Sequence, residues 1–256
     1  MTLAAAISIG NSSVHIGRLV EGTLEDVDQF DLADEIGPVD AVAAWFDGVE
    51  SGDRATIIAS VNPAADERLR DRIATAVGGE ILEIERDLAA PIGRGLDPGA
   101  SVGVDRLLAA AAAWDELKQA CIVIDAGTAV TVDFVDGEGT FQGGAILPGV
   151  ASMLDAVHRD TALLPETTFA VPEGEPWGRD TEGAIQRGVE AAIAGGAWKL
   201  VEKYALHYGG FPLVVATGGD AQALFRDDEL VSRVVPDLVL RGMAIAWRTA
   251  TEGSDA

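Results

Sequence analysis

One segment of the chain occurs twice, 117 positions apart. Residues 124–133 read as a strand, a tight glycine turn and a second strand, and residues 7–16 repeat this pattern without a gap. The register continues downstream, where Glu21–Leu24 matches Glu138–Phe141. A repeat of this kind predicts two related halves within one chain.

The expected halves are 1–119 and 120–256, each near the usual size of a domain. One copy lacks the carboxylate of the other, because Ser8 stands where the second copy has Asp125. In each half a hairpin is followed by alternating strand and helix patterns, which predicts an α/β protein with two mixed sheets. Strands are expected at 3–9, 14–20, 24–30, 56–60, 80–85 and 213–216. Helices are expected at 64–77, at 107–114 with its start in 103–106, at 150–157, at 181–204 and after Gly219.

Composition and charge exclude several classes of protein. Hydrophobic residues make up 48% of the chain, as in a packed globular protein. The 42 acidic residues outnumber 18 Lys and Arg residues, for a net charge of −24, which repels nucleic acid and anionic membranes. The acids are scattered, so a salt-adapted protein and an ordinary acidic cytosolic protein both fit. Cys121 is the single cysteine and lies in an apolar strand pattern, so neither a disulfide nor a multi-cysteine metal site is expected.

The apolar segments predict a cytoplasmic protein. No apolar run reaches the ~20 residues that span a bilayer. The segment 1–6 has no basic residues before its apolar stretch, so it does not read as a signal peptide.

The two glycine turns are candidate phosphate sites. Gly10-Asn11-Ser12 and Gly127-Thr128-Ala129 each place backbone N–H donors where the chain can approach a ligand closely. Either turn alone is an ordinary hairpin turn, but two copies in register favour phosphate binding. No Gly-x-x-x-x-Gly-Lys motif occurs, which excludes a P-loop.

Two further motifs carry candidate chemistry, each with a structural alternative. Asp105 follows Gly103 and precedes Arg106 at the start of an apolar helix. It is a candidate base for phosphoryl transfer, and the alternative is an acid that favours the helix N-terminus. Thr217-Gly218-Gly219 ends a strand before a helix, where paired glycines suit an adenine ring or a simple turn.

Taken in order, these motifs resemble the type III pantothenate kinases of the actin–Hsp70–sugar kinase superfamily. The resemblance covers nearly the whole chain and rests on several segments in the right order: 9–12, 102–106, 124–131, 143–149, Asp180-Thr181 and 217–219. It implies duplicated actin-like ATPase (ribonuclease H-like) domains with a nucleotide cleft between the halves. The implied reaction is ATP-dependent phosphorylation of pantothenate, the first step of coenzyme A biosynthesis.

The resemblance also implies roles for individual residues. Asp105 matches the general base, and Asp125 matches the ligand of an activating K⁺ or NH₄⁺ ion. The implied pantothenate contacts are Gly103, Val104, Asp105, Arg106, Thr181 and the loop position Leu96. The implied ATP contacts are Ser8, Gly10, Asn11, Ser12, Ser13, His15, Thr128, Gly218 and Gly219. Family members use Mg²⁺ with ATP and are typically homodimers, which suits the glycine-lined helix 181–204.

Two positions depart from the family pattern. Ser8 replaces an Asp that is expected to position Mg²⁺, and a neutral hydroxyl supplies no charge to that ion. Leu96 stands where a substrate-facing Tyr is common. These departures leave alternatives open: an impaired paralogue that binds nucleotide or pantothenate as a regulatory protein, and a kinase for another small hydroxylated acid.

Overall fold

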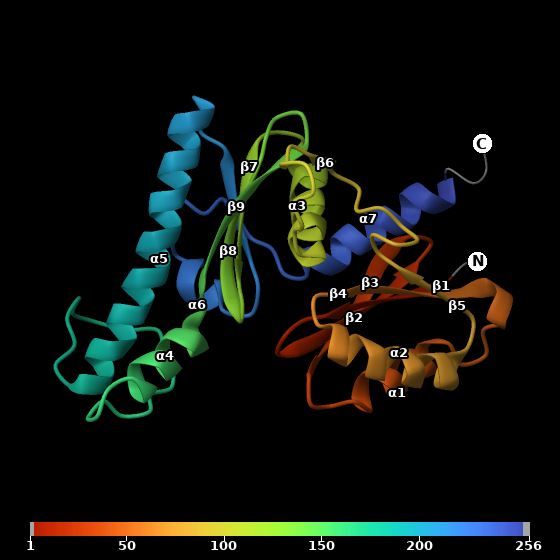
Figure 1. Cartoon of the computed structure of the whole chain (residues 1–256), viewed down its shortest axis with the longest axis horizontal. Helices are drawn as coiled ribbons and strands as arrows, with labels where there is room; N and C mark the ends of the chain where they lie inside the picture. The colour runs from red at the N-terminus through yellow and green to blue at the C-terminus, as the bar shows by residue number, and fades with distance from the viewer. Residues whose placement is uncertain (1–2, 253–256) are drawn as a thin grey trace. The chain divides into compact units, whose positions relative to one another are not determined.

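A computed structural model describes residues 3–252 of the chain, apart from the side chain of Ser51 (Figure 1). The contacts divide the chain into two compact units. Unit 1 consists of residues 1–93, 97–116 and 237–256, and unit 2 of residues 94–96 and 117–236. This division differs from the expected halves at residues 94–96 and 117–119, which group with unit 2, and in the C-terminal helix, which packs with unit 1.

Unit 1 is built on a five-stranded mixed sheet with the order β3-β2-β1-β4-β5. The first three strands form an antiparallel meander, and β4 and β5 continue the sheet in parallel. The strands are β1 (Leu3–Ile9), β2 (Ser13–Val20), β3 (Thr23–Asp31), β4 (Arg54–Ser60) and β5 (Glu80–Glu83). The helices are α1 (Gly37–Trp45), α2 (Pro63–Val77), α3 (Val104–Leu117) and α7 (Leu238–Glu252), with a 3₁₀ turn at Ser51–Asp53.

Helices pack on both faces of the sheet of unit 1. The core on the side of α1 and α2 contains Ile7, Ile9, Val14 and Ile16, all nearly inaccessible to solvent. On the other face, α7 contacts β1, β2 and β3. Gly242 of α7 lies so close to the backbone of α3 that a side chain there would collide with it.

Local sequence explains where α2 begins. Asn62 is its N-cap and accepts a hydrogen bond from the Ala65 N–H at 3.2 Å, and Pro63 occupies the first turn. Leu69, Ile73 and Val77 then recur on one buried face.

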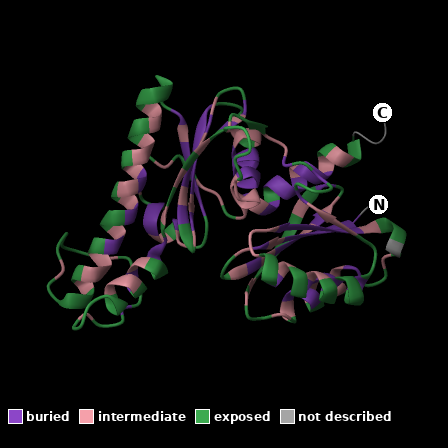
Figure 2. Cartoon of the chain, viewed as in Figure 1, coloured by how far each residue is buried: buried purple, intermediate pink, exposed green. Residues whose placement is uncertain are grey.

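Unit 2 is built on a six-stranded sheet with the order β11-β10-β7-β8-β9-β6. Its strands are β7 (Cys121–Ala126), β8 (Ala129–Val135), β9 (Thr140–Pro148), β10 (Leu213–Thr217), β11 (Arg233–Val234) and the two-residue edge strand β6 (Gly93–Arg94). Its helices are α4 (Val150–Arg159), α5 (Thr181–Tyr208) and α6 (Ala221–Phe225). Figure 2 shows the buried residues concentrated in the strands and on the helix faces that cover them.

The two hairpins are confirmed as repeated structures, but their strand pairing differs by one residue. In unit 1 Ser8 lies opposite His15, whereas in unit 2 Asp125 lies opposite Thr131. The turn of the second hairpin is therefore one residue shorter than that of the first. The turn after β8 is one residue longer, so the offset of 117 positions is restored between β3 and β9. The gap-free match of the sequences is wrong within β2 and β8: by pairing, His15 corresponds to Thr131.

The remaining expectations for the elements are largely confirmed. Each expected strand and helix occurs within a few residues of its place, and α5 is longer than expected. The expectations omitted α1, the separate helix α7 and the two-residue strands β6 and β11. Cys121 is fully buried in β7, and burial raises the pKa of its thiol to about 12.

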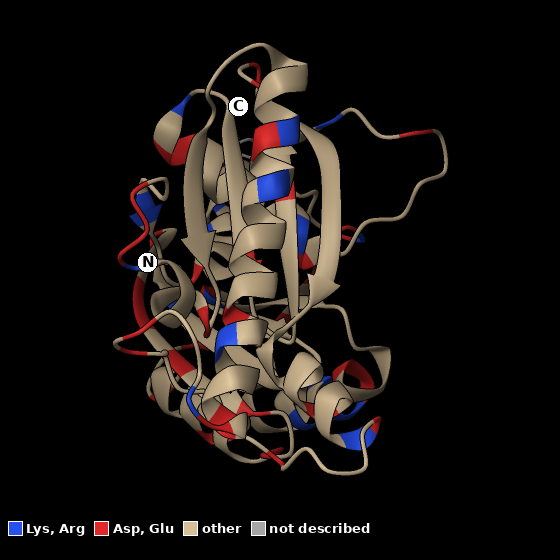
Figure 3. Cartoon of the chain, turned by 90° about the vertical axis from the view of Figure 1, so that its left-hand side faces the viewer, with Lys and Arg blue, Asp and Glu red and all other residues tan. Residues whose placement is uncertain are grey.

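The structure shows where the acidic residues lie and how apolar its helices are. Figure 3 shows acidic residues on many helices and loops rather than at one place. Between residues 3 and 252, no helix combines the length and the apolar character that crossing a membrane requires.

Candidate active site

The first glycine turn joins β1 and β2 in unit 1. The Gly10 N–H donates to the Ser13 carbonyl at 2.9 Å, and the Leu32 N–H donates to the Ser12 carbonyl at 3.0 Å. In unit 2 the Gly127 N–H donates to the Ala129 carbonyl at 3.1 Å in the same way. Both glycine N–H groups thus close their own turns, and the exposed residues that follow, rather than the glycines, face solvent.

Polar side chains gather beside the first turn. His15 Nε2 lies 3.1 Å from Ser13 Oγ, and its Nδ1 lies 3.7 Å from Oδ1 of Asp237, just before α7. Ser8 is half-buried and pairs with His15 across the hairpin. Because directly opposed residues of an antiparallel pair share a face, Ser8 belongs to the same patch.

The second turn packs against the start of α4. The Gly149 N–H donates to the Thr128 carbonyl at 3.2 Å, and Ser152 Oγ donates to the same oxygen at 3.3 Å. A side chain at Gly149 would collide with the backbone of Gly127 and Thr128. The Thr128 residue is exposed, as a phosphate contact requires.

Asp125 and the glycine pair meet at the ends of β7 and β10. Thr217 pairs with Asp125 in the parallel ladder, and Gly218 turns away from the sheet with φ of +94°. A Cβ on Gly218 would lie 2.5 Å from Oδ1 of Asp125 and would collide with the Ala126 carbonyl. A Cβ on Gly219 would meet no atom within 4 Å. The fold therefore requires glycine at Gly218 but not at Gly219.

Asp105 lies in the first turn of α3, as expected, and its carboxylate folds over the preceding glycine. A Cβ on Gly103 would lie 2.5 Å from Oδ1 of Asp105. Burial raises the pKa of the Asp105 carboxyl, although the Arg106 N–H donates to Oδ1 at 2.8 Å and the Arg106 charge also favours ionisation. A half-buried carboxylate with a raised pKa is suited to accept a proton.

A short chain of contacts joins Asp105 to the first turn. The Val61 N–H, after β4, donates to the Ile9 carbonyl at 3.1 Å, and Ile9 directly precedes the turn. Val61 Cγ1 lies 3.6 Å from the place of a Cβ on Gly103. Unit 1 thus brings the predicted base, with Val104 and Arg106 beside it, near the predicted phosphate loop.

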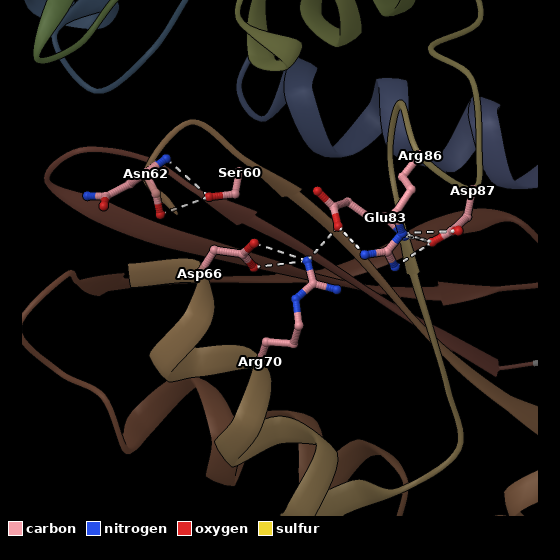
Figure 4. Close-up of polar contacts among 7 residues, drawn as sticks. All are labelled: Ser60, Asn62, Asp66, Arg70, Glu83, Arg86 and Asp87. Carbon is pink, nitrogen blue, oxygen red and sulfur yellow. Dashed lines mark hydrogen bonds and ion pairs between the residues drawn. The ribbon is translucent and has the colours of Figure 1, made fainter. Parts of the chain in front are cut away.

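The loop that carries Leu96 is anchored before it leaves unit 1. Glu83 at the end of β5 accepts hydrogen bonds from Arg70 at 3.0 Å and from Arg86 at 2.7 Å (Figure 4). Arg86 also binds Asp87, and this hydrogen bond is the main reason that the pKa of the Asp87 carboxyl is lowered. The Glu83 N–H donates to Asp87 at 2.8 Å, which closes the turn.

Leu96 itself packs in unit 2. The Gly95 N–H donates to the Phe141 carbonyl of β9 at 2.9 Å, and Leu96 Cδ2 lies 3.8 Å from the place of a Cβ on Gly143. The neighbouring Gly144 leaves room for the carboxylate of Asp133, with which a side chain would collide. In the 143–149 motif, the left-handed backbone explains Gly143, with φ of +101°, and close packing explains Gly144.

Thr181 is the exposed first residue of α5. The N-cap Asp180 accepts a hydrogen bond from the Gly183 N–H at 2.7 Å, which fixes the helix start. The Asp180-Thr181 motif is therefore a capped helix N-terminus on the surface.

Three further acidic residues lie beside these motifs, and of them the sequence singled out only Asp133, as an alternative acid for Mg²⁺. Asp133 is 2% exposed in β8 and accepts a hydrogen bond from Thr131 Oγ1 at 3.0 Å. Asp220 follows the glycine pair, and burial raises the pKa of its carboxyl. Asp237 faces His15. Of the other two, only Asp237 had a local signal, as an Asp directly before an apolar helical pattern.

Comparison with known proteins identifies the family to which this chain is similar. A family model described as type III pantothenate kinase matches residues 5–203. Curated relatives named type III pantothenate kinase include one from Desulfovibrio desulfuricans, 33% identical over 92% of each chain. Another, from Rhodospirillum rubrum, is 36% identical over 84% of each chain.

Solved structures show the same fold at low sequence identity. The activator of 2-hydroxyisocaproyl-CoA dehydratase from Clostridium difficile, with bound ADPNP, is 14% identical with a TM-score of 0.56, and covers 99% of this chain and 97% of its own. MreB5 of Spiroplasma citri, bound to ADP, is 11% identical with a TM-score of 0.53, covering 100% and 99%. These likenesses confirm the actin-like fold with two mixed sheets. The family match and the curated relatives show that the chain belongs to the type III pantothenate kinases.

Proposed function

We propose that this chain transfers the γ-phosphoryl group of ATP to the hydroxyl of pantothenate, forming 4′-phosphopantothenate in the first step of coenzyme A biosynthesis. The observation that carries this proposal is the half-buried Asp105, whose carboxyl has a raised pKa and which is linked through Val61 to the first glycine turn. Family membership supports the choice of substrates.

Asp105 acts as the general base in this proposal. Its carboxylate accepts the hydroxyl proton of pantothenate while the hydroxyl oxygen forms a bond to the γ-phosphorus and ADP leaves. Its raised pKa increases its proton affinity at the moment of transfer. Arg106 then binds the substrate carboxylate or a phosphate oxygen, with Gly103 and Val104 lining the acceptor. Leu96 and Thr181 complete the proposed acceptor contacts.

Glycines that the fold does not need support the ATP contacts. A Cβ on Gly127 would meet only an ordinary contact at 3.9 Å, and one on Gly219 would meet none within 4 Å. A ligand that approaches the backbone closely explains why glycine occurs there. Ser8, Gly10, Asn11, Ser12, Ser13 and His15, with Thr128 and Gly218, are the remaining proposed contacts.

The residues present fit one monovalent cation better than a protein-bound divalent one. In the part of the chain between residues 3 and 252, no three His, Cys, Asp or Glu residues cluster in a way that could hold a metal ion. Mg²⁺ is therefore proposed to arrive with the ATP phosphates and its own waters, where it neutralises phosphate charge. Asp125, beside the Ala126 carbonyl, offers oxygen atoms for K⁺ or NH₄⁺.

Removing the Asp125 carboxylate is expected to abolish the dependence on K⁺. In Asp125→Ala the rate should no longer rise with K⁺, because no anionic oxygen remains to hold the cation. Steady-state rates across a K⁺ titration, with choline chloride keeping ionic strength constant, measure this. Asp136→Ala in the same unit is the control and should retain the wild-type response. An unchanged titration in Asp125→Ala would contradict the cation role.

A direct assay tests the whole proposal. Purified protein with ATP, Mg²⁺ and K⁺ should convert pantothenate to phosphopantothenate, detected by mass spectrometry together with stoichiometric ADP. Other small hydroxylated acids serve as acceptor controls. Turnover of one of those instead would change the substrate, and tight nucleotide binding without any turnover would replace the kinase by a binding protein.

We further propose that the protein is a cytoplasmic homodimer. Exposed large apolar residues flank the C-terminal end of α5, with Leu206 75% and Phe211 99% exposed. Along α5, a side chain at Gly188 or Gly195 would meet no atom within 4 Å, so the helix surface is open for close packing. Light scattering during size-exclusion chromatography measures the expected doubled mass.

A further inference from the structure

Strand β1 has Ser8 where β7 has Asp125, but unit 1 has another carboxylate nearby, that of Asp237. In unit 2 the hairpin carries Asp125 on its first strand, opposite the hydroxyl of Thr131. In unit 1 the hydroxyl of Ser8 stands on the first strand, opposite His15. Oδ1 of Asp237 lies 3.7 Å from Nδ1 of this histidine ring.

We propose that His15, held by Asp237, donates a hydrogen bond directly to phosphate, in place of the contact that a carboxylate at position 8 would provide through a metal ion. This inference rests on the proposed binding of ATP at the first turn. A carboxylate cannot approach a phosphate without a cation between them, whereas an imidazole N–H can donate to a phosphate oxygen. Asp237 is the positioning residue, because it acts only through the ring.

The geometry aims the imidazole at the turn. His15 Nε2 lies 3.1 Å from Ser13 Oγ, and the Ser13 carbonyl accepts the N–H of Gly10. The opposite ring nitrogen is the one that faces Asp237. The ring therefore bridges a carboxylate on one side and the predicted phosphate loop on the other.

The backbone alone does not explain a charge at Asp237. Its φ of +59° is an uncommon conformation that Asp and Asn tolerate best, and its carbonyl accepts the Arg241 N–H at 3.0 Å at the start of α7. Asn would satisfy both requirements. The partly exposed contact with His15 contributes little to stability, and an acid before α7 also favours the helix N-terminus. The contact with the ring is what favours a role in ligand binding.

Calorimetry with the non-hydrolysable analogue ADPNP tests the inference on the full chain, once with Mg²⁺ and once with EDTA. His15→Ala should weaken binding about tenfold or more in both conditions, as expected for a lost hydrogen bond to a charged group. Asp237→Asn should weaken binding without lowering Tm. His207→Ala, at an exposed histidine of unit 2, should bind like the wild type.

A double variant separates the two ways of holding phosphate. Ser8→Asp added to His15→Ala should restore affinity with Mg²⁺ but not with EDTA, because a carboxylate needs the metal. Equal affinity of wild type and His15→Ala, or recovery of the double variant in EDTA, overturns the inference. If His15→Ala loses Tm, His15→Gln, which keeps an N–H donor, should retain part of the affinity. A wild type that binds no ADPNP would instead contradict the proposed function.

Discussion

Replacing Asp105 with asparagine is expected to lower kcat by about 10²–10⁴-fold, the usual contribution of a general base. The affinity for ATP should change little, because Asp105 acts on the acceptor. Steady-state kinetics and calorimetry with ADPNP measure the two quantities separately. Glu116→Gln, at the exposed far end of α3, is the matched control and should retain wild-type kcat. Retention of most activity in Asp105→Asn would show that another group takes the proton.

The same substitution should stabilise the fold, because burial raises the pKa of the Asp105 carboxyl above its ordinary value of 3.8. As the pH rises from that value through the raised pKa, the unfolded chain releases its proton first, so the free energy of unfolding falls. Above the raised pKa the full penalty of a buried charge remains. Asn carries no such penalty.

Thermal melts at two pH values check this sign. The gain in Tm of Asp105→Asn over wild type should be larger at neutral pH than just above pH 3.8. A gain that shrinks with rising pH would contradict the raised pKa. Loss of activity together with a gain in stability would mark Asp105 as a residue retained for function.

Substituting the two adjacent glycines with alanine is expected to give opposite results. Gly218→Ala forces a side chain into a left-handed conformation and against the Ala126 carbonyl and Asp125. Its cost should be at least about 2 kcal/mol, from backbone strain and steric overlap. Gly219→Ala meets open space, so its Tm should stay near wild type while its affinity for ADPNP falls by about 1–3 kcal/mol.

Differential scanning calorimetry and ADPNP titration of both variants measure these effects. The two positions serve as controls for each other, since they share a turn and a chemical change. Unchanged affinity in Gly219→Ala would remove the nucleotide from this turn. Unchanged Tm in Gly218→Ala would mean that the turn adjusts to a side chain.

The amino-acid sequence was sufficient for most of the fold because its signals are local. Short apolar runs predicted β1 and β7, and the apolar run after Asp105 predicted a buried helix, confirmed by the burial of Leu107 and its neighbours. The repeat predicted a duplicated hairpin. The match between the two copies is wrong by one residue in β8. The turn before β8 is one residue shorter and the turn after it one residue longer, so the sequence shows no gap and only the strand pairing reveals the shift.

The membership of the family was also readable from the sequence, since its motifs are contiguous and occur in order. The roles of single residues required neighbours that lie far apart in the chain. Gly218 and Gly219 look alike in the sequence, yet only the backbone of β7 beneath Gly218 decides which of them the fold needs.

The sequence by itself determined the two mixed sheets, the repeated turn and the absence of a carboxylate at Ser8. Only the tertiary structure decided what stands in that place. The pairing of β1 with β2 sets His15 opposite Ser8, and the packing of α7 on this sheet brings Asp237 to the ring. No local pattern encodes that contact, because it forms only when apolar burial closes the last helix onto the first strands.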